Sequence, residues 1–191
     1  MAPAALPAAS LPPSTGADVT VIVNFKGPYS EAAVKTMRRE TEQILKSSGV
    51  SLEWRSRAEA GDLSFNDLVV VSFKGSCQFN PAPLVVDELG PYAVTRITGG
   101  EVQPFGEVDC DHIVSSIRGA MNGEDLARAD MLLGRALGRV VAHELVHMLT
   151  KSTHHGKEGV EKSSLTARQL IAESLPLSAM DVNRLLERRA H

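Results

Sequence analysis

The feature that most constrains this fold is a long helix predicted over residues 124–153. Its apolar side chains form a broad stripe at helical spacing: Leu126, Leu133, Leu137, Val140, Val141, Leu145 and Met148. So wide a stripe is expected of a central, mostly buried helix. Gly134, Gly138 and Ala142 stand four apart on one face. Because each helical glycine costs about 1 kcal/mol relative to alanine, this row indicates that another element packs close to the backbone there.

The residues before this helix alternate between strand and helix patterns. Runs of β-branched or apolar residues predict strands over 18–25, 50–55 and 67–73. A helix is expected over 30–49, with Ser30 as its N-cap and Gly49 at its end. The third strand has a continuous apolar run, which predicts burial on both of its faces. A hairpin is expected around residues 99–100, where two glycines are adjacent.

The ends of the chain differ from this middle part. Residues 1–17 are rich in Ala and Pro and lack apolar periodicity, which is typical of a disordered tail. After residue 159, two further helices are predicted, with Thr166 and Ser178 as N-caps. We therefore expect one domain over 18–191, in which 18–150 holds the sheet and the long helix and 151–191 forms a C-terminal subdomain.

Charge and hydropathy exclude two classes of partner. The net charge is −3, and no Lys/Arg cluster is longer than the terminal "ERRAH", so a nucleic-acid partner is not expected. No apolar run approaches the roughly 18 residues that span a bilayer. The chain is thus not expected to cross a membrane.

The two cysteines, Cys77 and Cys110, each follow an apolar run. Both are expected at strand ends, where a bridge between neighbouring strands is geometrically possible. Reduced thiols in a cytosolic protein are the alternative. We favour the disulfide, and we interpret "DCDH" at 109–112 as a strand end, the disulfide cysteine and an N-cap rather than as a metal site, because adjacent strand residues point to opposite faces.

Four of the six histidines lie within residues 143–155, beside one glutamate. In "HELVH", His143 and His147 are four apart on a helix, so both imidazoles can bind one zinc ion. Glu144 can reach a water on that ion without being a ligand. A catalytic zinc site takes a third protein ligand, and His154 and His155, past the expected helix end, are the candidates.

This motif resembles that of the metzincin metalloproteases, His-Glu-x-x-His-x-x-Gly-x-x-His, in its first half. Thr150 stands in place of the glycine, and Thr153 stands in place of the third histidine. The run is more similar to a group of small, exported bacterial metzincin-like proteins with the pattern HExxH-x-L-x-x-S/T-x-x-H-x-x-x-G. In that register the third ligand is His155 and the trailing glycine is Gly159. The two extra residues would let the chain turn back without a left-handed glycine.

The resemblance extends over residues 18–160 and implies an α+β fold, with a metzincin-like twisted mixed sheet, a backing helix, a long central active-site helix and a short helical C-terminal part. It also implies that the edge region at 94–108 lines the cleft and binds a peptide. Metzincins place a methionine turn beneath the metal, and "SAMD" resembles it weakly at Met180. The stronger interpretation of that stretch is a capping box ending at Asp181.

The resemblance implies a zinc metalloendopeptidase of the HExxH type. Zn²⁺ held by His143, His147 and His155 would lower the pKa of its water, and Glu144 would pass the water's proton to the leaving amine. The substrate would be a peptide or protein, and we expect a monomer that is secreted or periplasmic. Another class remains open: a non-catalytic zinc-binding or peptide-binding protein on the same fold. A Glu173 ligand, as in gluzincins, is less favoured than a surface role for that carboxylate.

Overall fold

A computed structural model describes residues 17–61, 63–79 and 90–188, so that 1–16 of the predicted tail lies outside the described residues. Its centre is a five-stranded sheet with the order β2-β1-β3-β5-β4. The strands are β1 (Val19–Phe25), β2 (Leu52–Ser56), β3 (Leu68–Lys74), β4 (Ala93–Thr98) and β5 (Glu101–Asp109). Neighbouring strands are parallel except β4, which runs antiparallel to β5. The sheet is therefore mixed, and β4 forms one of its edges.

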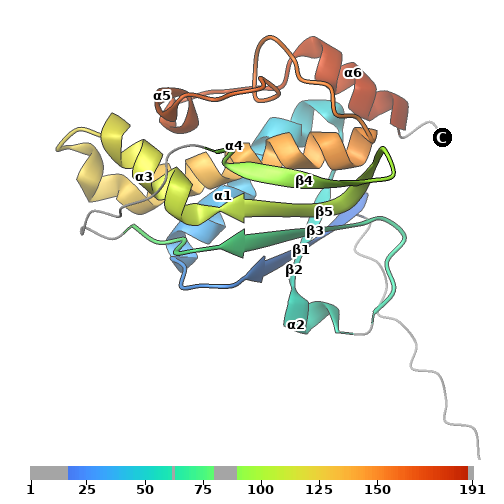
Figure 1. Ribbon diagram of the computed structural model, residues 1–191, viewed down its shortest axis with the longest axis horizontal. Coiled ribbons are helices and arrows are strands. Elements are labelled where there is room, and N and C mark those ends of the chain that lie inside the picture. The colour runs from blue at the N-terminus through green and yellow to red at the C-terminus, as the bar shows by residue number, and fades with distance from the viewer. Residues whose placement is uncertain (1–16, 62, 80–89, 189–191) are drawn as a thin grey trace, which may run out of the picture.

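Two long helices cover one face of this sheet (Figure 1). The helices are α1 (Glu31–Leu45), α2 (Arg57–Ala60), α3 (Cys110–Ala120), α4 (Ala129–Thr150), α5 (Ala167–Ile171) and α6 (Ala179–Arg188), with short 3-10 helices η1 (Lys46–Ser48) and η2 (Asp125–Arg128). The backing helix is α1, which packs along α4, while α5 and α6 lie beyond α4. The expected α+β architecture is confirmed.

The long helix α4 is central but shorter than predicted. It begins at Ala129, because Asp125 to Arg128 form the separate turn η2. Leu126 lies in η2 and is 57% exposed, so it does not belong to the buried stripe. A Cβ atom on Gly138 would lie 2.7 Å from Glu40 Cβ and 2.8 Å from Met37 O of α1. The glycine row is thus explained by the close approach of α1, as predicted.

Burial along the strands departs from the expectation in one place. In β3, buried Val69, Val71 and Phe73 alternate with half-buried residues, so β3 is not buried on both faces. The continuously buried strand is instead β1, over residues 19–23. The short helix α2, which was not predicted, packs against β1 and β2.

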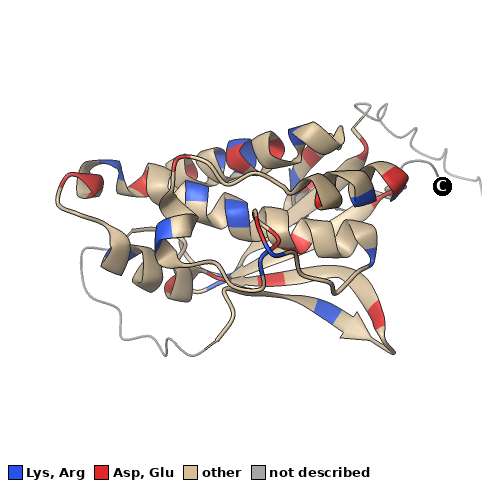
Figure 2. Cartoon of the chain, turned by 90° about the horizontal axis from the view of Figure 1, so that it is seen from above, with Lys and Arg blue, Asp and Glu red and all other residues tan. Residues whose placement is uncertain are grey.

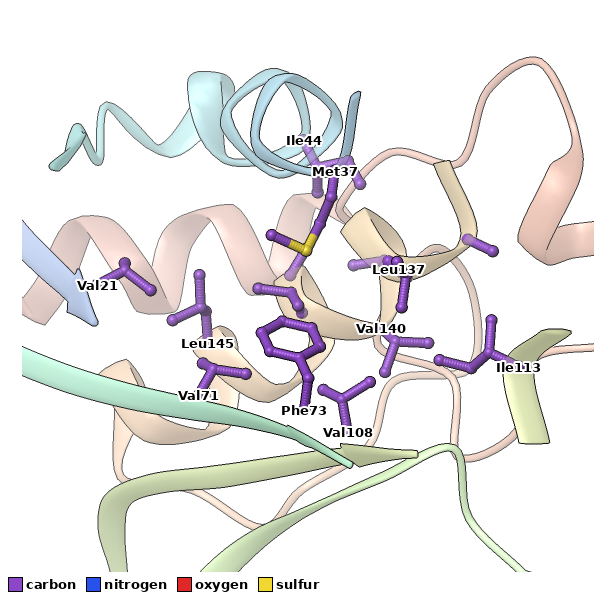
Figure 3. Packing of buried hydrophobic residues seen from close by; sticks show 14 of the residues in the cluster. Val21, Met37, Ile44, Val71, Phe73, Val108, Ile113, Leu137, Val140 and Leu145 are labelled. Atoms are coloured by element: carbon purple, nitrogen blue, oxygen red, sulfur yellow. The ribbon is translucent and has the colours of Figure 1, made fainter. Parts of the chain in front are cut away.

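The main core lies between the sheet and the two long helices. Figure 3 shows Phe73 of β3 at its centre, below Met37 of α1 and beside Val140 of α4. Phe73 and Met37 are fully buried. Each such side chain contributes about 1.5–3 kcal/mol when it is removed from water. This packing sets the position of α4 relative to the sheet.

Cys77 and Cys110 form a disulfide, with their Cα atoms 4.9 Å apart. The bond joins the segment after β3 to the first residue of α3, and Asp109 is the N-cap of that helix, accepting the His112 N–H. The predicted bridge is confirmed, whereas the N-cap is the strand-end residue Asp109 rather than Asp111. The bridge anchors α3 directly to the sheet.

The C-terminal segment is tied to α4 by two arginine side chains. Arg139, which is fully buried, donates to the carbonyls of Gln169 and Ala172 and pairs with Glu40 at 2.9 Å. Arg135 donates to the Ile171 and Ala172 carbonyls, each at 2.9 Å. The predicted caps Thr166 and Ser178 both accept backbone N–H groups. The C-terminal segment is therefore held against α4 by side-chain hydrogen bonds.

Charges on the helices are mixed in sign. Figure 2 shows Lys and Arg interspersed with Asp and Glu along the helices seen from above. Among the residues that the structure describes, no helix combines the length and apolar character that crossing a bilayer requires.

Candidate metal centre

His143 and His147 project from α4 one turn apart. Their Nε2 atoms lie 3.1 Å from each other. His143 Nδ1 bonds to the Val160 carbonyl at 2.9 Å, and His147 Nδ1 bonds to the Ser152 carbonyl at 2.7 Å. Because a carbonyl oxygen can only accept, both Nδ1 atoms carry the proton and both Nε2 atoms present a lone pair. With both rings neutral, two lone pairs therefore face each other, an arrangement that a bound cation would satisfy.

His155 completes the cluster from the loop after α4. Its ring centroid lies 5.2 Å from that of His143 and 4.7 Å from that of His147. One ligand atom from each of the three histidines lies within 4.8 Å of the others. His154 and His155 are both exposed, but His154 is not part of this cluster, and its backbone N–H donates to the Ser152 hydroxyl. Of the two candidates for the third ligand, the structure brings His155 to the others.

The reversal that delivers His155 begins at Lys151. This residue is in the left-handed region, with φ 52°, and its N–H bonds the His147 carbonyl. The turn thus needs no glycine, as expected, but it does need a left-handed residue. For a non-glycine residue that conformation is uncommon and costs energy. The same turn brings the Ser152 carbonyl back to His147 Nδ1.

The donor set fits zinc. Zn–N bonds of about 2.0–2.1 Å can span Nε2 atoms 3.1 Å apart. Burial is the main cause that lowers the pKa of both His143 and His147. For His147, the neighbouring His143 lowers the pKa further. Both rings are therefore neutral at physiological pH, which is the form that binds a metal.

Glu144 lies beside this cluster and is 5% exposed. The Thr95 hydroxyl of β4 donates to Glu144 Oε2 at 2.5 Å. Burial raises the pKa of Glu144, and the Thr95 bond opposes that rise. Sequence reasoning missed Thr95, because no local pattern indicates which strand residue will lie over the helix.

A cleft of about 550 Å³ runs between β4 and α4, past the histidines. Its walls come from β4 (Ala93, Val94, Thr95 and Ile97), from α4 and from the segment 162–165. The predicted edge position is wrong for the second half of 94–108, which is β5 and pairs with both β3 and β4. Because the chain reverses at residues 99–100, β4 alone of this hairpin lies at the edge.

One buried carboxyl group behind the histidines, that of Glu161, was not predicted. Glu161 Oε1 lies 3.4 Å from His143 Nδ1, and Glu161 Oε2 lies 4.0 Å from His147 Nε2. Among the described residues, neither oxygen has a hydrogen-bond partner. Burial is the main cause that raises the pKa of Glu161 to about 9, and the nearby carboxyl groups of Asp181 and Glu144 add to the rise. Such orphaned oxygens are a second sign that a cation belongs here.

The other candidates from the sequence lie elsewhere. Glu173 is exposed and is not part of the histidine cluster. Met180 is 58% exposed on α6, so it does not form a methionine turn beneath the metal. Asp181, the predicted capping-box residue, is the buried member of "SAMD". Its carboxylate accepts a hydrogen bond from the Ser178 hydroxyl. In "DCDH", His112 is buried against Tyr92 and away from this cluster.

No protein-family model matches the chain, and no curated protein matches it. Among solved structures, the chain is similar to archaemetzincin from Methanopyrus kandleri, with a TM-score of 0.56 and 12% sequence identity. The similarity covers 95% of this chain and 100% of that one. Identity this low shows the fold alone. The mixed sheet with its long central helix is therefore an archaemetzincin-like fold.

Proposed function

We propose that this protein is a zinc-dependent endopeptidase in which His143, His147 and His155 hold the metal and Glu144 is the general base. The observation that carries the proposal is the pair of Nε2 lone pairs 3.1 Å apart, with His155 beside them and Glu144 next along the helix. The archaemetzincin-like fold supports a metallopeptidase-type function. At 12% identity, that fold does not carry the proposal by itself.

When bound, zinc would supply a Lewis acid for the scissile carbonyl and lower the pKa of a water molecule. Glu144 would accept the proton of the attacking water and deliver it to the leaving amine. The Thr95 hydroxyl orients the carboxylate for this role through its 2.5 Å bond. The two Nδ1 bonds to carbonyls hold the imidazoles in the tautomer that leaves Nε2 free.

The cleft supports a peptide as the substrate. Strand β4 is an edge strand along the cleft, so an extended peptide could add to it through main-chain hydrogen bonds. Exposed Val94 and Ile97 of β4, together with Leu165 across the cleft, offer apolar contacts to its side chains. These features favour extended segments with apolar residues near the cleaved bond.

A non-catalytic zinc protein is the second candidate. The observation in its favour is Glu161, whose Oε2 lies 4.0 Å from His147 Nε2. If this carboxylate bound the metal with the three histidines, the site would have four protein ligands. Closed sites of that kind are structural rather than catalytic.

The first experiment measures zinc per chain by elemental mass spectrometry on protein without a histidine tag. The parent should hold about one zinc, His155→Ala should hold much less, and His154→Ala, the exposed neighbour, should match the parent. No zinc in the parent would refute the metal centre.

The second experiment measures chelator-sensitive cleavage of casein. Glu144→Ala should keep its zinc and lose hydrolysis by roughly 10²–10⁴-fold, the usual contribution of a general base. Glu158→Ala, an exposed glutamate nearby, is the control. Full activity of Glu144→Ala would refute the mechanism, and an inactive parent that holds zinc would favour the non-catalytic candidate.

We further propose that the protein works outside the cytoplasm, secreted or periplasmic. The Cys77–Cys110 disulfide supports this, because such bonds persist in oxidising compartments. Thiol counting on denatured, unreduced protein should find no free thiol. Two free thiols would contradict this location.

A further inference from the structure

Glu161 lies on a segment that is held between α4 and the C-terminal loop. Gly159 precedes it with φ +68°, and a Cβ atom there would lie 2.5 Å from the Pro176 carbonyl oxygen. The Val160 N–H donates to that same carbonyl at 3.1 Å. The Val160 carbonyl in turn accepts from His143 Nδ1 at 2.9 Å. These contacts place the next residue, Glu161, directly behind the metal-binding histidines.

The Glu161 carboxyl group has an unfavourable environment when no cation is bound. Its side chain is 1% exposed, and among the described residues neither oxygen has a hydrogen-bond partner. Asp181, also buried, lies on the same side, and both residues flank Gly156. Arg184 lies 3.6 Å from Asp181 Oδ1 but makes no hydrogen bond to that atom. A buried carboxyl group without a hydrogen-bond partner destabilises a fold, and its ionised form does so strongly unless a cation lies close to it.

The carboxyl oxygens face the histidine pair. Oε1 lies 3.4 Å from His143 Nδ1, on the side of the ring that donates to Val160. The mutually close ligand atoms belong to the three histidines and do not include Glu161. The carboxylate is thus placed to act on the metal through its charge and through His143.

We propose that Glu161 is a positioning residue of the metal centre, whose carboxylate is the anionic partner of the cation held by His143, His147 and His155. This inference rests on the metal site of the proposed function. Glu161 increases the affinity for a divalent cation through its negative charge beside the ligand His143, and the metal-free fold is less stable because of it. Groups that support metal ligands in this way typically change metal affinity by about 10–100-fold.

The test compares the parent with E161Q, which removes the charge, and E161M, which fills a similar volume with an apolar side chain. The control is E158Q, the same change at an exposed position three residues away. Zn²⁺ affinity is measured by competition with a chromophoric chelator. Thermal unfolding is measured with zinc and with EDTA, and the Co²⁺ absorption spectrum reports the ligand set.

E161Q and E161M should bind Zn²⁺ about 10–100-fold more weakly than the parent, while E158Q should match the parent. In EDTA, E161M should unfold at a higher temperature than the parent, and with zinc this advantage should disappear. The Co²⁺ spectrum of E161Q should keep the ligand-field bands of the parent.

Three results would overturn this inference and leave the proposed function standing. Equal zinc affinity in E161Q and the parent would show that the charge plays no part. A lower unfolding temperature of both variants in EDTA would make the role structural. Altered Co²⁺ bands in E161Q would make Glu161 a ligand. A parent that binds no zinc would refute both this inference and the proposed function. The zinc content of the parent therefore distinguishes a failure of the proposed function from a failure of the Glu161 inference alone.

Discussion

The contact between Thr95 and Glu144 links the edge of the sheet to the proposed chemistry. Replacing Thr95 by valine removes the hydroxyl donor and keeps the shape of the side chain. A hydrogen bond to a charged group contributes about 1.5–3 kcal/mol. Since 1.4 kcal/mol is a factor of ten, loss of this bond should reduce the ionised fraction of Glu144 by about 10–100-fold wherever that group is mostly protonated.

The sign of the effect follows from the pKa of Glu144. Burial raises that pKa, and the Thr95 bond lowers it. Thr95→Val therefore raises the pKa further, and the general base is protonated over a wider acidic range. On the acidic side of the pH profile, kcat/KM should fall by about 10–100-fold. As the pH rises and Glu144 ionises, kcat/KM should approach that of the parent.

The assay is the initial rate of peptide hydrolysis from pH 5 to pH 9, with the zinc content measured at each pH. Thr98→Val, an exposed threonine on the same strand, is the matched control. If the acidic limbs of Thr95→Val and the parent coincide, Thr95 does not act on Glu144. A loss that is equal at every pH would also refute the reasoning, because it would indicate a change in substrate binding.

Two further predictions concern stability. Arg139→Met should reduce the free energy of unfolding by about 3–5 kcal/mol in urea titrations, because it leaves Glu40 and the Gln169 carbonyl without their arginine partner; a loss below about 1 kcal/mol would contradict this. For metal-free protein, the free energy of unfolding should fall as the pH rises from 7 towards 9, by up to about 1.4 kcal/mol per pH unit. The folded state keeps the Glu161 proton up to a pKa of about 9, whereas the unfolded state releases it near 4.5. E161Q should show a flatter profile, and an equal slope would assign the effect to another group.

The features that the sequence predicted correctly depend on residues close together in the chain. The spacing of His143 and His147 and the caps at Thr166 and Ser178 follow from helix geometry over a few residues. The row formed by Gly134 and Gly138 predicted a close neighbour for the same reason, although it could not identify that neighbour as α1. Local periodicity is therefore enough for the central helix and for two of the three proposed ligands.

The remaining parts of the site depend on contacts between distant segments. Thr95 and Glu144 are 49 residues apart, and they meet because β4 folds back along β5 to the sheet edge beside α4. Asp181 reaches the space behind the histidines because the C-terminal segment packs on α4. His155 is the exception, because it follows the left-handed turn at Lys151 by only four residues, and the resemblance of the motif had already indicated it as the third ligand.

The sequence alone thus determined the helix that carries the metal-binding pair, because a helix is built from local hydrogen bonds and its side-chain directions repeat every few residues. The tertiary structure decided which groups surround that pair. The threonine on the edge strand and the buried Glu161 owe their positions to sheet order and to packing between segments that no short-range pattern specifies.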